Sequence, residues 1–406
     1  MKARKLTKLK RQQQTCKVYE LKIDKSKLSK QSANHLNQLF KEAKWFYNYC
    51  LSLDDVNNAD TKAKSVPVKV LEEYENRDFL ALKSGMKQGI KTRMFNSMSS
   101  LKALKQNGRR IGRLRFKSQI NSIPLKQFNN TYYIDIPQSR IRVQGMKSWL
   151  KVRGLDQIPA DSEIANAVLT RKAGDFFLKV TVYTNKVSRE VPEQSIGIDF
   201  GCETQLTLSD GTKIQFQVPI SKRIKKLDRK IMRRGKASNS KNKFKDRLKR
   251  QKAYAKLNNK KKDIRNKVVS AITNNFQYVC FQDESIRGWK AGGHGKKIQH
   301  SGIGGIISDL KHKSVTPLLV NKFFPSTQLC PECSSKNKHE KSERIYNCSC
   351  GYSLDRDIHA AKNIETEGLK QIPVGRREFT LTENTTSTFF NALSKIDGVK
   401  VSKLVR

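Results

Sequence analysis

Four of the eight cysteines fall within 21 residues, and their spacing is the strongest constraint on how this chain folds. Cys330 and Cys333 form a C-x2-C pair, and after a spacer of 14 residues Cys348 and Cys350 form a C-x-C pair. Two such knuckles supply four thiolates for a tetrahedral structural Zn²⁺, with no position left open for water. The C-x2-C half is specific, the C-x-C half is less usual, and the alternative is a set of unrelated reduced thiols. The spacing therefore predicts a structural zinc site.

Basic residues dominate the composition. The chain has 82 Lys and Arg against 36 Asp and Glu, which gives a formal net charge of +46. Such an excess repels itself unless a polyanion neutralises it, and nucleic acid is the default partner. The alternative is an anionic membrane surface, but no apolar run approaches the ~18 residues that span a bilayer. The remaining cysteines (Cys16, Cys50, Cys202, Cys280) are scattered singly, which is typical of reduced thiols in a cytosolic protein.

The N-terminal half alternates between strand and helix patterns. The first fifteen residues are basic with little periodicity, and we interpret them as an arm that becomes ordered on a polyanion. Residues 17–24 alternate like a strand, whereas residues 32–51 and 79–105 carry apolar side chains at helical spacing. Residues 106–190 contain short alternating stretches separated by turn residues, which predicts a small β-barrel. The strand that precedes the helices would have to join this barrel, so the helical pair is an insertion in a β domain.

The C-terminal half opens with a short apolar strand over residues 195–200. Residues 205–218 predict a hairpin that turns at an Asp-Gly pair. A long helical segment follows over residues 222–267, with 22 Lys or Arg against three acids, and residues 235–240 break it into an αα-hairpin. The ordinary interpretation is a solvated helical face, but single-signed charge at this density destabilises a helix. We therefore favour a role in facing phosphates.

The segment beyond this hairpin carries a second buried-type strand, residues 277–282. A glycine-rich, basic loop follows, and residues 287–305 are predicted to act as a lid, as such loops do beside an active site. A short helix over residues 306–312 and a strand over residues 318–323 precede the cysteines. From Glu365 onward the chain has an irregular, basic pattern.

Three acids stand at the ends of predicted elements. Asp199 ends one strand, Glu284 follows another, and Asp357 opens the helical stretch DIHAAKNI. Three carboxylates from distant element ends can hold two divalent cations about 4 Å apart, and hard oxygen ligands favour Mg²⁺ or Mn²⁺. The alternative is that each acid is a turn residue or a helix cap. Asp283 and Asp355 lie beside two of these acids and compete with them for the same assignment.

These motifs together resemble the TnpB family of transposon-encoded RNA-guided nucleases, the relatives of the compact type V CRISPR effectors. The resemblance covers most of the chain and is carried by AKWFYNYCL, GRLRFK, SIGIDFG, LTLSDGTKI, FFPSTQLCPEC, NCSCGYSLDRDIHAAKNI and GRREFTLTEN. It implies that Asp199, Glu284 and Asp357 are the catalytic acids of a RuvC-like domain with an RNase H fold. Asp355 would then be a neighbour of the third acid.

The implied fold class is α+β multidomain. It combines an RNase H-like (RuvC) nuclease domain, which carries a zinc ribbon insertion, with an N-terminal β-barrel (wedge) domain that holds an inserted helical recognition domain. The expected boundaries are residues 1–34 for the basic arm and first wedge strand, 35–106 for the recognition domain, 107–190 for the wedge barrel, 191–324 and 353–370 for the nuclease domain, 325–352 for the zinc ribbon and 371–406 for a C-terminal tail.

The implied activity is that of an RNA-guided DNA endonuclease. A guide RNA pairs with target DNA beside a short flanking motif, and one acidic site cuts the DNA by two-metal-ion hydrolysis. The expected partners are an element-derived guide RNA and target double-stranded DNA, with no membrane. We expect a monomer on one RNA, in a prokaryotic cytoplasm and associated with the nucleoid when active. The cations expected to bind nucleic acid are Lys241, Lys245, Arg247, Lys249, Arg250, Arg113, Arg115 and Lys117.

Three other functions remain open from the sequence alone. A DNA transposase also uses three acids on an RNase H fold, and it predicts binding to DNA ends without RNA. An RNA-guided DNA binder predicts unchanged DNA binding without magnesium-dependent cleavage. A basic RNA chaperone would need neither the acids nor a DNA target.

Overall fold

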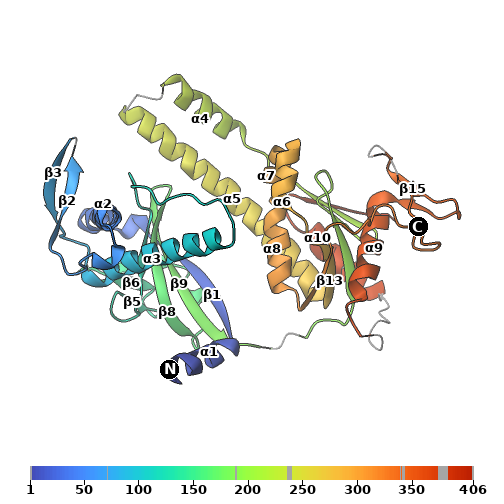
Figure 1. Cartoon of the computed structure of the whole chain (residues 1–406), viewed down its shortest axis with the longest axis horizontal. Helices are drawn as coiled ribbons and strands as arrows, with labels where there is room; N and C mark the ends of the chain where they lie inside the picture. Colours follow the sequence, from blue (N-terminus) through green and yellow to red (C-terminus); the bar gives the residue numbers. More distant parts are fainter. Residues whose placement is uncertain are drawn as a thin grey trace. The chain divides into compact units, whose positions relative to one another are not determined.

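The structure is a computed structural model that describes residues 2–70, 72–187, 190–235, 240–338, 340, 343–373 and 383–404. The chain divides after residue 187 into two compact units (Figure 1). Each unit has its own sheet and its own hydrophobic core, so each is described by itself. Among the helices of the described ranges, none combines the length and the apolar composition that crossing a membrane requires.

The first unit is built on a seven-stranded antiparallel sheet. Its strands, in spatial order, are β4 (Ser122–Leu125), β8 (Glu163–Lys172), β9 (Asp175–Asn185), β1 (Gln14–Ile23), β7 (Leu150–Arg153), β6 (Arg140–Val143) and β5 (Tyr132–Asp135). β1 pairs with both β9 and β7, so the strand that precedes the helices lies inside the sheet that follows them. This pairing is the long-range association that the sequence predicts for residues 17–24.

Two long helices and a hairpin lie between β1 and β4 in the chain. The helices are α2 (Lys30–Ser52) and α3 (Ser84–Gln106), close to their predicted bounds. α2 begins where the Ser29 hydroxyl accepts the backbone N–H of Ser32, and its buried face carries Leu36, Leu39, Phe40, Ala43 and Phe46. Burial of each large apolar side chain contributes about 1.5–3 kcal/mol, which fixes this face on the sheet core.

The hairpin is a feature that the sequence did not predict. It consists of β2 (Ser65–Val70) and β3 (Glu73–Asp78), and every residue of β3 is exposed. The polar composition of β3 hides that strand from a search for apolar alternation, whereas the alternating Val66, Val68 and Val70 of β2 were an available signal. The chain returns from the hairpin to the core at Ala81 and Leu82, whose backbone N–H groups donate to the buried carboxylate of Glu42.

The predicted N-terminal arm is instead a helix, α1 (Lys2–Gln12). Two of its cations are neutralised or shielded within the unit. Lys10 Nζ lies 2.8 Å from Glu163 Oε2, and the Arg11 guanidinium lies 3.6 Å from the ring centroid of Tyr183. The expectation of a segment without regular structure is wrong for residues 2–12, which form a helix that contacts β8 and β9.

The second unit is built on a six-stranded mixed sheet. Its strands, in spatial order, are β14 (Thr316–Val320), β13 (Tyr278–Gln282), β10 (Ser195–Phe200), β11 (Leu206–Leu208), β12 (Thr212–Phe216) and β17 (Val399–Lys403). β10, β11 and β12 are antiparallel neighbours, whereas β13 and β14 run parallel to β10. The β11–β12 turn needs Gly211, whose φ of 87° is costly for any residue with a Cβ.

Helices cover both faces of this sheet. Alternation along β13 sends Val279 and Phe281 to one core and Tyr278 and Cys280 to the other. The first face is covered by α5 (Lys241–Asn275), α8 (Ile303–Lys313) and α10 (Glu383–Ser394), and the second by α9 (Arg356–Leu369) (Figure 1). α9 crosses β10 so closely that a Cβ on Gly197 would lie 2.0 Å from the carbonyl oxygen of Ala361.

The basic helical segment forms the predicted αα-hairpin. α4 (Lys222–Arg233) begins at the capping hydroxyl of Ser221, and α5 begins at that of Ser240. α5 extends eight residues beyond the predicted end, because Val268 and Ile272 continue its buried stripe to Asn275.

The segment predicted as a loop over residues 287–305 is largely helical. It contains α6 (Ile286–Trp289), a kinked turn over Lys290–His294 in which Gly292 and Gly293 leave the helical conformation, α7 (Gly295–Ser301) and the start of α8 (Ile303–Lys313). Ile298 and Ile303 are buried and anchor it to the sheet core. The glycines that suggested a loop instead separate short helices, as Gly293 does with a φ of 86°.

The predicted irregular C-terminal tail is also wrong for the residues described. α9 continues past Glu365 to Leu369, α10 buries Phe389 and Leu393, and β17 completes the sheet. The motif GRREFTLTEN lies mostly outside the described residues. A small hairpin, β15 (Ile345–Asn347) with β16 (Ser353–Asp355), flanks the second cysteine pair.

Candidate functional site

The three acids predicted to be catalytic line one cleft of about 910 Å³ in the second unit, together with Glu203 and Asp355. Asp199 lies near the C-terminal end of β10, Glu284 follows β13 by two residues, and Asp357 lies in the first turn of α9. β10 and β13 are parallel neighbours, so their C-terminal ends meet at one edge of the sheet, which is where open sheets place their sites. The structure therefore brings together the three acids that the sequence singles out.

The charges of Asp357 and Glu284 act on the Asp199 carboxyl. Burial, with the neighbouring carboxylates of Asp357 and Glu284, raises the pKa of Asp199 to about 8. Burial also raises the pKa of Glu284, although Trp289 Nε1 donates a 3.0 Å hydrogen bond to its Oε2 and offsets part of this effect. A half-buried group of like charges is stabilised by a cation. This donor set of carboxylate oxygens fits Mg²⁺ or Mn²⁺.

Cations surround the acids on the wall of the cleft. Six basic side chains line it: Lys213, Lys297, Lys322, Lys336, Arg344 and Arg356. Some already have acidic partners, since Lys297 and Arg344 both pair with Glu203. The basic side chains around the cleft can attract the phosphates of a nucleic acid, and metal ions held by the acids would then lie beside those phosphates.

Asp355 has a different position from Asp357. Asp355 Oδ1 accepts the backbone N–H groups of Asp357 and Ile358 and caps α9, while its Oδ2 lies 2.7 Å from Lys213 Nζ. Both oxygens are therefore occupied within the protein. Asp355 thus holds the N-terminus of α9, and Asp357 is the acid of this pair whose charge raises the pKa of Asp199.

A similar distinction separates Asp283 from Glu284. Asp283 forms an ion pair with Lys311 and is exposed, and it does not line the cleft. Glu284 does line it. Of these two acids, the cleft therefore contains Glu284, the one that the family resemblance implies.

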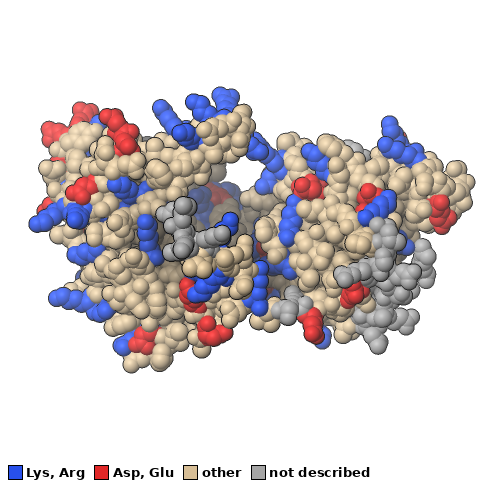
Figure 2. Space-filling model, turned by 60° about the horizontal axis from the view of Figure 1, so that its bottom comes forward, with Lys and Arg blue, Asp and Glu red and all other residues tan. Residues whose placement is uncertain are grey.

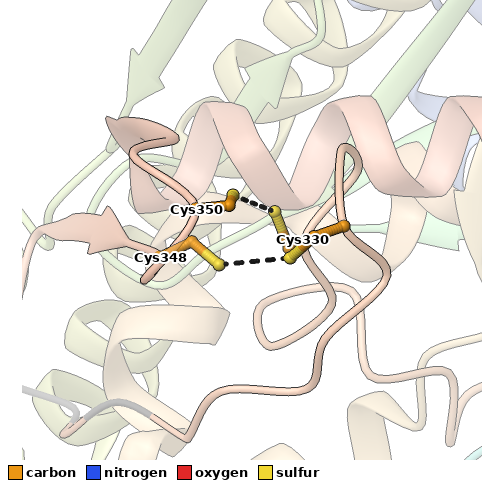
Figure 3. A group of neighbouring side chains, drawn as sticks. Cys330, Cys348 and Cys350 are labelled. Atoms are coloured by element: carbon orange, nitrogen blue, oxygen red, sulfur yellow. Dashed lines mark hydrogen bonds between the residues drawn. The ribbon is translucent and has the colours of Figure 1, made fainter.

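The four clustered cysteines converge at a second site in the same unit. Their sulfur atoms all lie within 4.8 Å of one another, and the Cys330–Cys350 and Cys333–Cys348 sulfur pairs are 3.6 and 3.4 Å apart. Figure 3 shows the side chains of Cys330, Cys348 and Cys350 pointing toward a common centre. Four thiolates at about 2.3 Å from a Zn²⁺ are separated by about 3.8 Å, so the donor set fits tetrahedral zinc.

Two residues that sequence reasoning missed connect α9 to the cysteine cluster. His359 is fully buried and stacks on Tyr346 of β15. Asn363, one helical turn later, donates from Nδ2 to the backbone carbonyls of Ser326 and Leu329, both at 2.7 Å. The i,i+4 spacing of His359 and Asn363 was the available signal, because it places two polar side chains on one buried helix face.

The predicted nucleic-acid-binding cations fall on both units. Lys241, Lys245, Arg247 and Lys249 are exposed on α5, whereas Arg250 pairs with Asp228 at 3.1 Å. Figure 2 shows Lys and Arg side chains distributed widely over the visible face of the molecule.

The other predicted cations belong to the first unit. Arg113, Arg115 and Lys117 line a cavity of about 520 Å³ together with Arg93 and Tyr47. Lys117 Nζ lies 4.1 Å from the ring centroid of Tyr47. Cations interleaved with an aromatic ring suit a nucleic-acid strand.

Two protein-family models match separate parts of the chain. Residues 178–283, which include β10 to β13, match a family described as "Probable transposase". Residues 307–364, which include all four clustered cysteines and Asp357, match "Cas12f1-like, TNB domain".

Curated relatives match about half of the chain. A "Putative RNA-guided DNA endonuclease" of Streptomyces pristinaespiralis is 27% identical over 230 residues, covering 54% of this chain and 57% of the relative. "TnpB-like protein L79" of Acanthamoeba polyphaga mimivirus is 29% identical over 224 residues, covering 50% and 42%. "Putative RNA-guided DNA endonuclease InsQ" of Escherichia coli (strain K12) is 24% identical over 264 residues, covering 58% and 63%. The matched regions thus span about half the length of these relatives.

A solved structure described as "Cryo-EM structure of the Cas12f1-sgRNA-target DNA complex" aligns with 83% of this chain and 83% of its own, at 14% identity and a TM-score of 0.47. The two family models and the curated relatives agree with the motifs around the acids and the cysteines. The matched models and relatives support an assignment of the chain to the TnpB family.

Proposed function

We propose that this protein is an RNA-guided DNA endonuclease with a single metal-dependent cleavage site. The observation that carries the proposal is the cleft in which Asp199, Glu284 and Asp357 meet from three separate elements. Relatives named as RNA-guided DNA endonucleases support the same activity. The mixed six-stranded sheet of the second unit, with three antiparallel and two parallel strand pairings beside α9, supports a RuvC-like, RNase H-type nuclease domain over residues 191–324 and 353–370.

In this proposal the carboxylates act as cation ligands. Two Mg²⁺ ions, when bound, would activate water and stabilise the leaving oxygen of the cut phosphodiester. Asp199 must lose its proton to serve as a ligand, and the cation would lower its raised pKa. Lys213 holds the Asp355 cap, which keeps Asp357 in the first turn of α9. Trp289 orients the Glu284 carboxylate from the other side.

The remaining parts would position nucleic acid. The proposed wedge, residues 107–190, and recognition domain, residues 35–106, would hold the guide RNA and its heteroduplex through backbone contacts. The exposed cations of α5 would face phosphates, and the four cysteines would hold a structural Zn²⁺ that keeps residues 325–352 folded beside α9. Guide RNA and target DNA would together neutralise much of the +46 charge.

Replacement of Asp199 tests the assignment of the site. Asp199→Ala should abolish magnesium-dependent DNA cleavage while the affinity for copurifying RNA stays unchanged, because the substitution removes a cation ligand and no phosphate contact. Asp283→Ala is the matched control, since Asp283 is a neighbouring acid outside the cleft. Cleavage that survives Asp199→Ala would show that the site is wrong.

The transposase remains the second candidate, because one family model is described in those words. Sequencing RNA that copurifies with the protein separates the two. A discrete RNA that directs cleavage supports the guided endonuclease. An RNA-free protein that joins DNA ends supports the transposase. An RNA-guided binder without cleavage would instead retain guided DNA binding with no product in Mg²⁺.

A further inference from the structure

Phe323 is an exposed aromatic side chain on the wall of the acidic cleft. It is 80% exposed, and it lines the same cleft as Asp199, Glu284 and Asp357. Its neighbour Phe324 packs against the apolar cluster beneath α9. Phe324 therefore contributes to the core, whereas Phe323 is not stabilised by burial.

The exposure of Phe323 is fixed by a hydrogen-bonded turn. The backbone N–H of Phe323 donates to Asn321 Oδ1 at 2.9 Å. The buried Gln282 donates from Nε2 to the carbonyls of Asn321 and Phe324, at 3.3 and 2.9 Å. Gln282 is the last residue of β13, two positions before Glu284. The turn that presents the ring is thus tied to the strand that presents one of the acids.

A cation accompanies the ring. Lys322 Nζ lies 4.6 Å from the ring centroid of Phe323, and it lines the same cleft. A flat apolar face beside an ammonium group matches a nucleotide, whose base stacks on the ring and whose phosphate meets the cation. The polar, basic wall around it suits a nucleic-acid strand better than an apolar ligand or a hydrophobic protein surface.

We propose that Phe323 is a stacking platform for one base of the single-stranded DNA that enters the acidic cleft, and that it thereby positions the phosphodiester to be cut. This inference rests on the proposed function, because it takes DNA to be the strand in the cleft. Stacking does not read the identity of a base, so Phe323 sets the position of the cut and not its sequence.

The test removes either the ring or the base that it contacts. The full chain with its copurified RNA is given target DNA whose displaced strand carries one abasic position, moved nucleotide by nucleotide past the cut. For the unaltered protein, abasic sites at one or two adjacent positions should lower kcat/KM by roughly 5- to 150-fold, the range of one base–aromatic stack. Phe323→Ala should show a similar decrease on intact DNA and no further decrease at those positions.

Two variants control for folding and for chemistry. Phe323→Tyr should show the same dependence of kcat/KM on the position of the abasic site as the unaltered protein, because the ring face is retained. Leu319→Ala removes another partly exposed apolar side chain, 40% exposed, from the preceding strand and outside the cleft, and should cleave normally. Circular dichroism should show Phe323→Ala folded, since the truncated side chain is on the surface.

The outcomes separate the inference from the proposed function. If the DNA is cut, but Phe323→Ala cuts at the normal rate or keeps the abasic penalty, the stacking role is wrong and the endonuclease stands. If no DNA is cut in Mg²⁺, the proposed function fails, and 2-aminopurine placed in a single-stranded oligodeoxynucleotide tests the stack directly. Quenching that disappears in Phe323→Ala then supports the inference, and equal quenching in both proteins overturns it.

Discussion

His359 of α9 lies flat against Tyr346 of β15, with ring centroids 3.8 Å apart and an interplanar angle of 12°. His359 is two residues from Asp357, and Tyr346 is two residues from Cys348. The same helix is tied to the approach to Cys330 by the hydrogen bonds of Asn363. The cysteine cluster and the acidic cleft therefore share a packed boundary, through which we expect the stability of the two sites to be coupled.

Removal of the His359 ring should destabilise the second unit. His359→Ala leaves a cavity and removes the stack, at a cost of about 2–4 kcal/mol in the free energy of unfolding. His359→Phe keeps a ring but removes the 3.1 Å interaction between His359 Nε2 and Asn363, so its cost should be about 1–3 kcal/mol. Urea denaturation measures both values. Equal stability of His359→Ala and the unaltered protein would contradict the proposed coupling.

Zinc should bind in a ratio of one ion per chain. Cys333→Ser removes one thiolate, so metal analysis should show the loss of zinc, and thermal unfolding should begin at a lower temperature. Cys16→Ser is the control, because Cys16 is an exposed thiol of β1 far from the cluster in sequence. A zinc content that Cys333→Ser leaves unchanged would exclude the cluster as the site.

Stability without Mg²⁺ should fall as the pH rises toward 8. The raised pKa of Asp199 means that the folded chain holds this proton more tightly than the unfolded chain, whose Asp has a pKa near 3.9. The stabilisation is complete below about pH 3.9 and is lost as the pH rises through about 8. Asp199→Asn removes this dependence, so at pH 8 it should be more stable than the unaltered protein by about 1–3 kcal/mol.

The measurement is urea denaturation at pH 5 and pH 8 in magnesium-free buffer without a zinc chelator. Added Mg²⁺ should restore stability at pH 8 in the unaltered protein and do less for Asp199→Asn. A stability difference between the two proteins that is the same at both pH values would show that the Asp199 proton is not involved.

Asp355, the N-cap residue of α9, should tolerate replacement by Asn better than replacement by Ala. Asp355→Ala removes the cap and the Lys213 ion pair and should cost about 1–2 kcal/mol, whereas Asp355→Asn keeps a capping oxygen and should cost less. Cleavage should fall in the same order, since Asp357 follows the cap. A loss of cleavage as complete as that of Asp357→Ala would instead make Asp355 a direct ligand.

Neutralisation of the α5 cations should weaken nucleic-acid binding without changing its sequence preference. Replacement of Lys241, Lys245, Arg247 and Lys249 by Gln should lower the affinity about equally for all targets and reduce the salt slope by roughly one unit for each phosphate that is no longer neutralised. Arg250→Gln should have a smaller effect, because Asp228 already neutralises it. Filter binding over a salt series measures the slope, and a target-selective decrease would indicate base readout.

The parts that the sequence predicted are those with local signals. Residues 195–200 carry an apolar run and form β10, and the Asp-Gly pair after Leu208 forms the β11–β12 turn. The cysteines converge because metal-ligand spacing is itself a distance constraint. The acids converge because each lies at the end of an element that reaches the same edge of the sheet.

The parts that the sequence missed depend on distant partners. α10 and β17 are short and polar enough to resemble a tail, and only their packing on α5 and β12 stabilises them. Residues 287–305 have the composition of a loop, yet Ile298 and Ile303 find a core that no local pattern reveals. The role of Asn363 depends on the backbone carbonyls of Ser326 and Leu329. Because every residue has a backbone carbonyl, the sequence does not show which of them accept a hydrogen bond.

Strand β17 also sets the timing of folding on the ribosome. Thr212 lies opposite Lys403 in the register, so β12 must wait for a partner made 191 residues later. At about 5–20 residues per second, synthesis of that stretch takes roughly 10–40 s. Throughout this interval the edge of β12 is unpaired and open to the wrong strand. Chains that stall or are cut before β17 emerges are therefore the ones that we expect to aggregate and to be degraded.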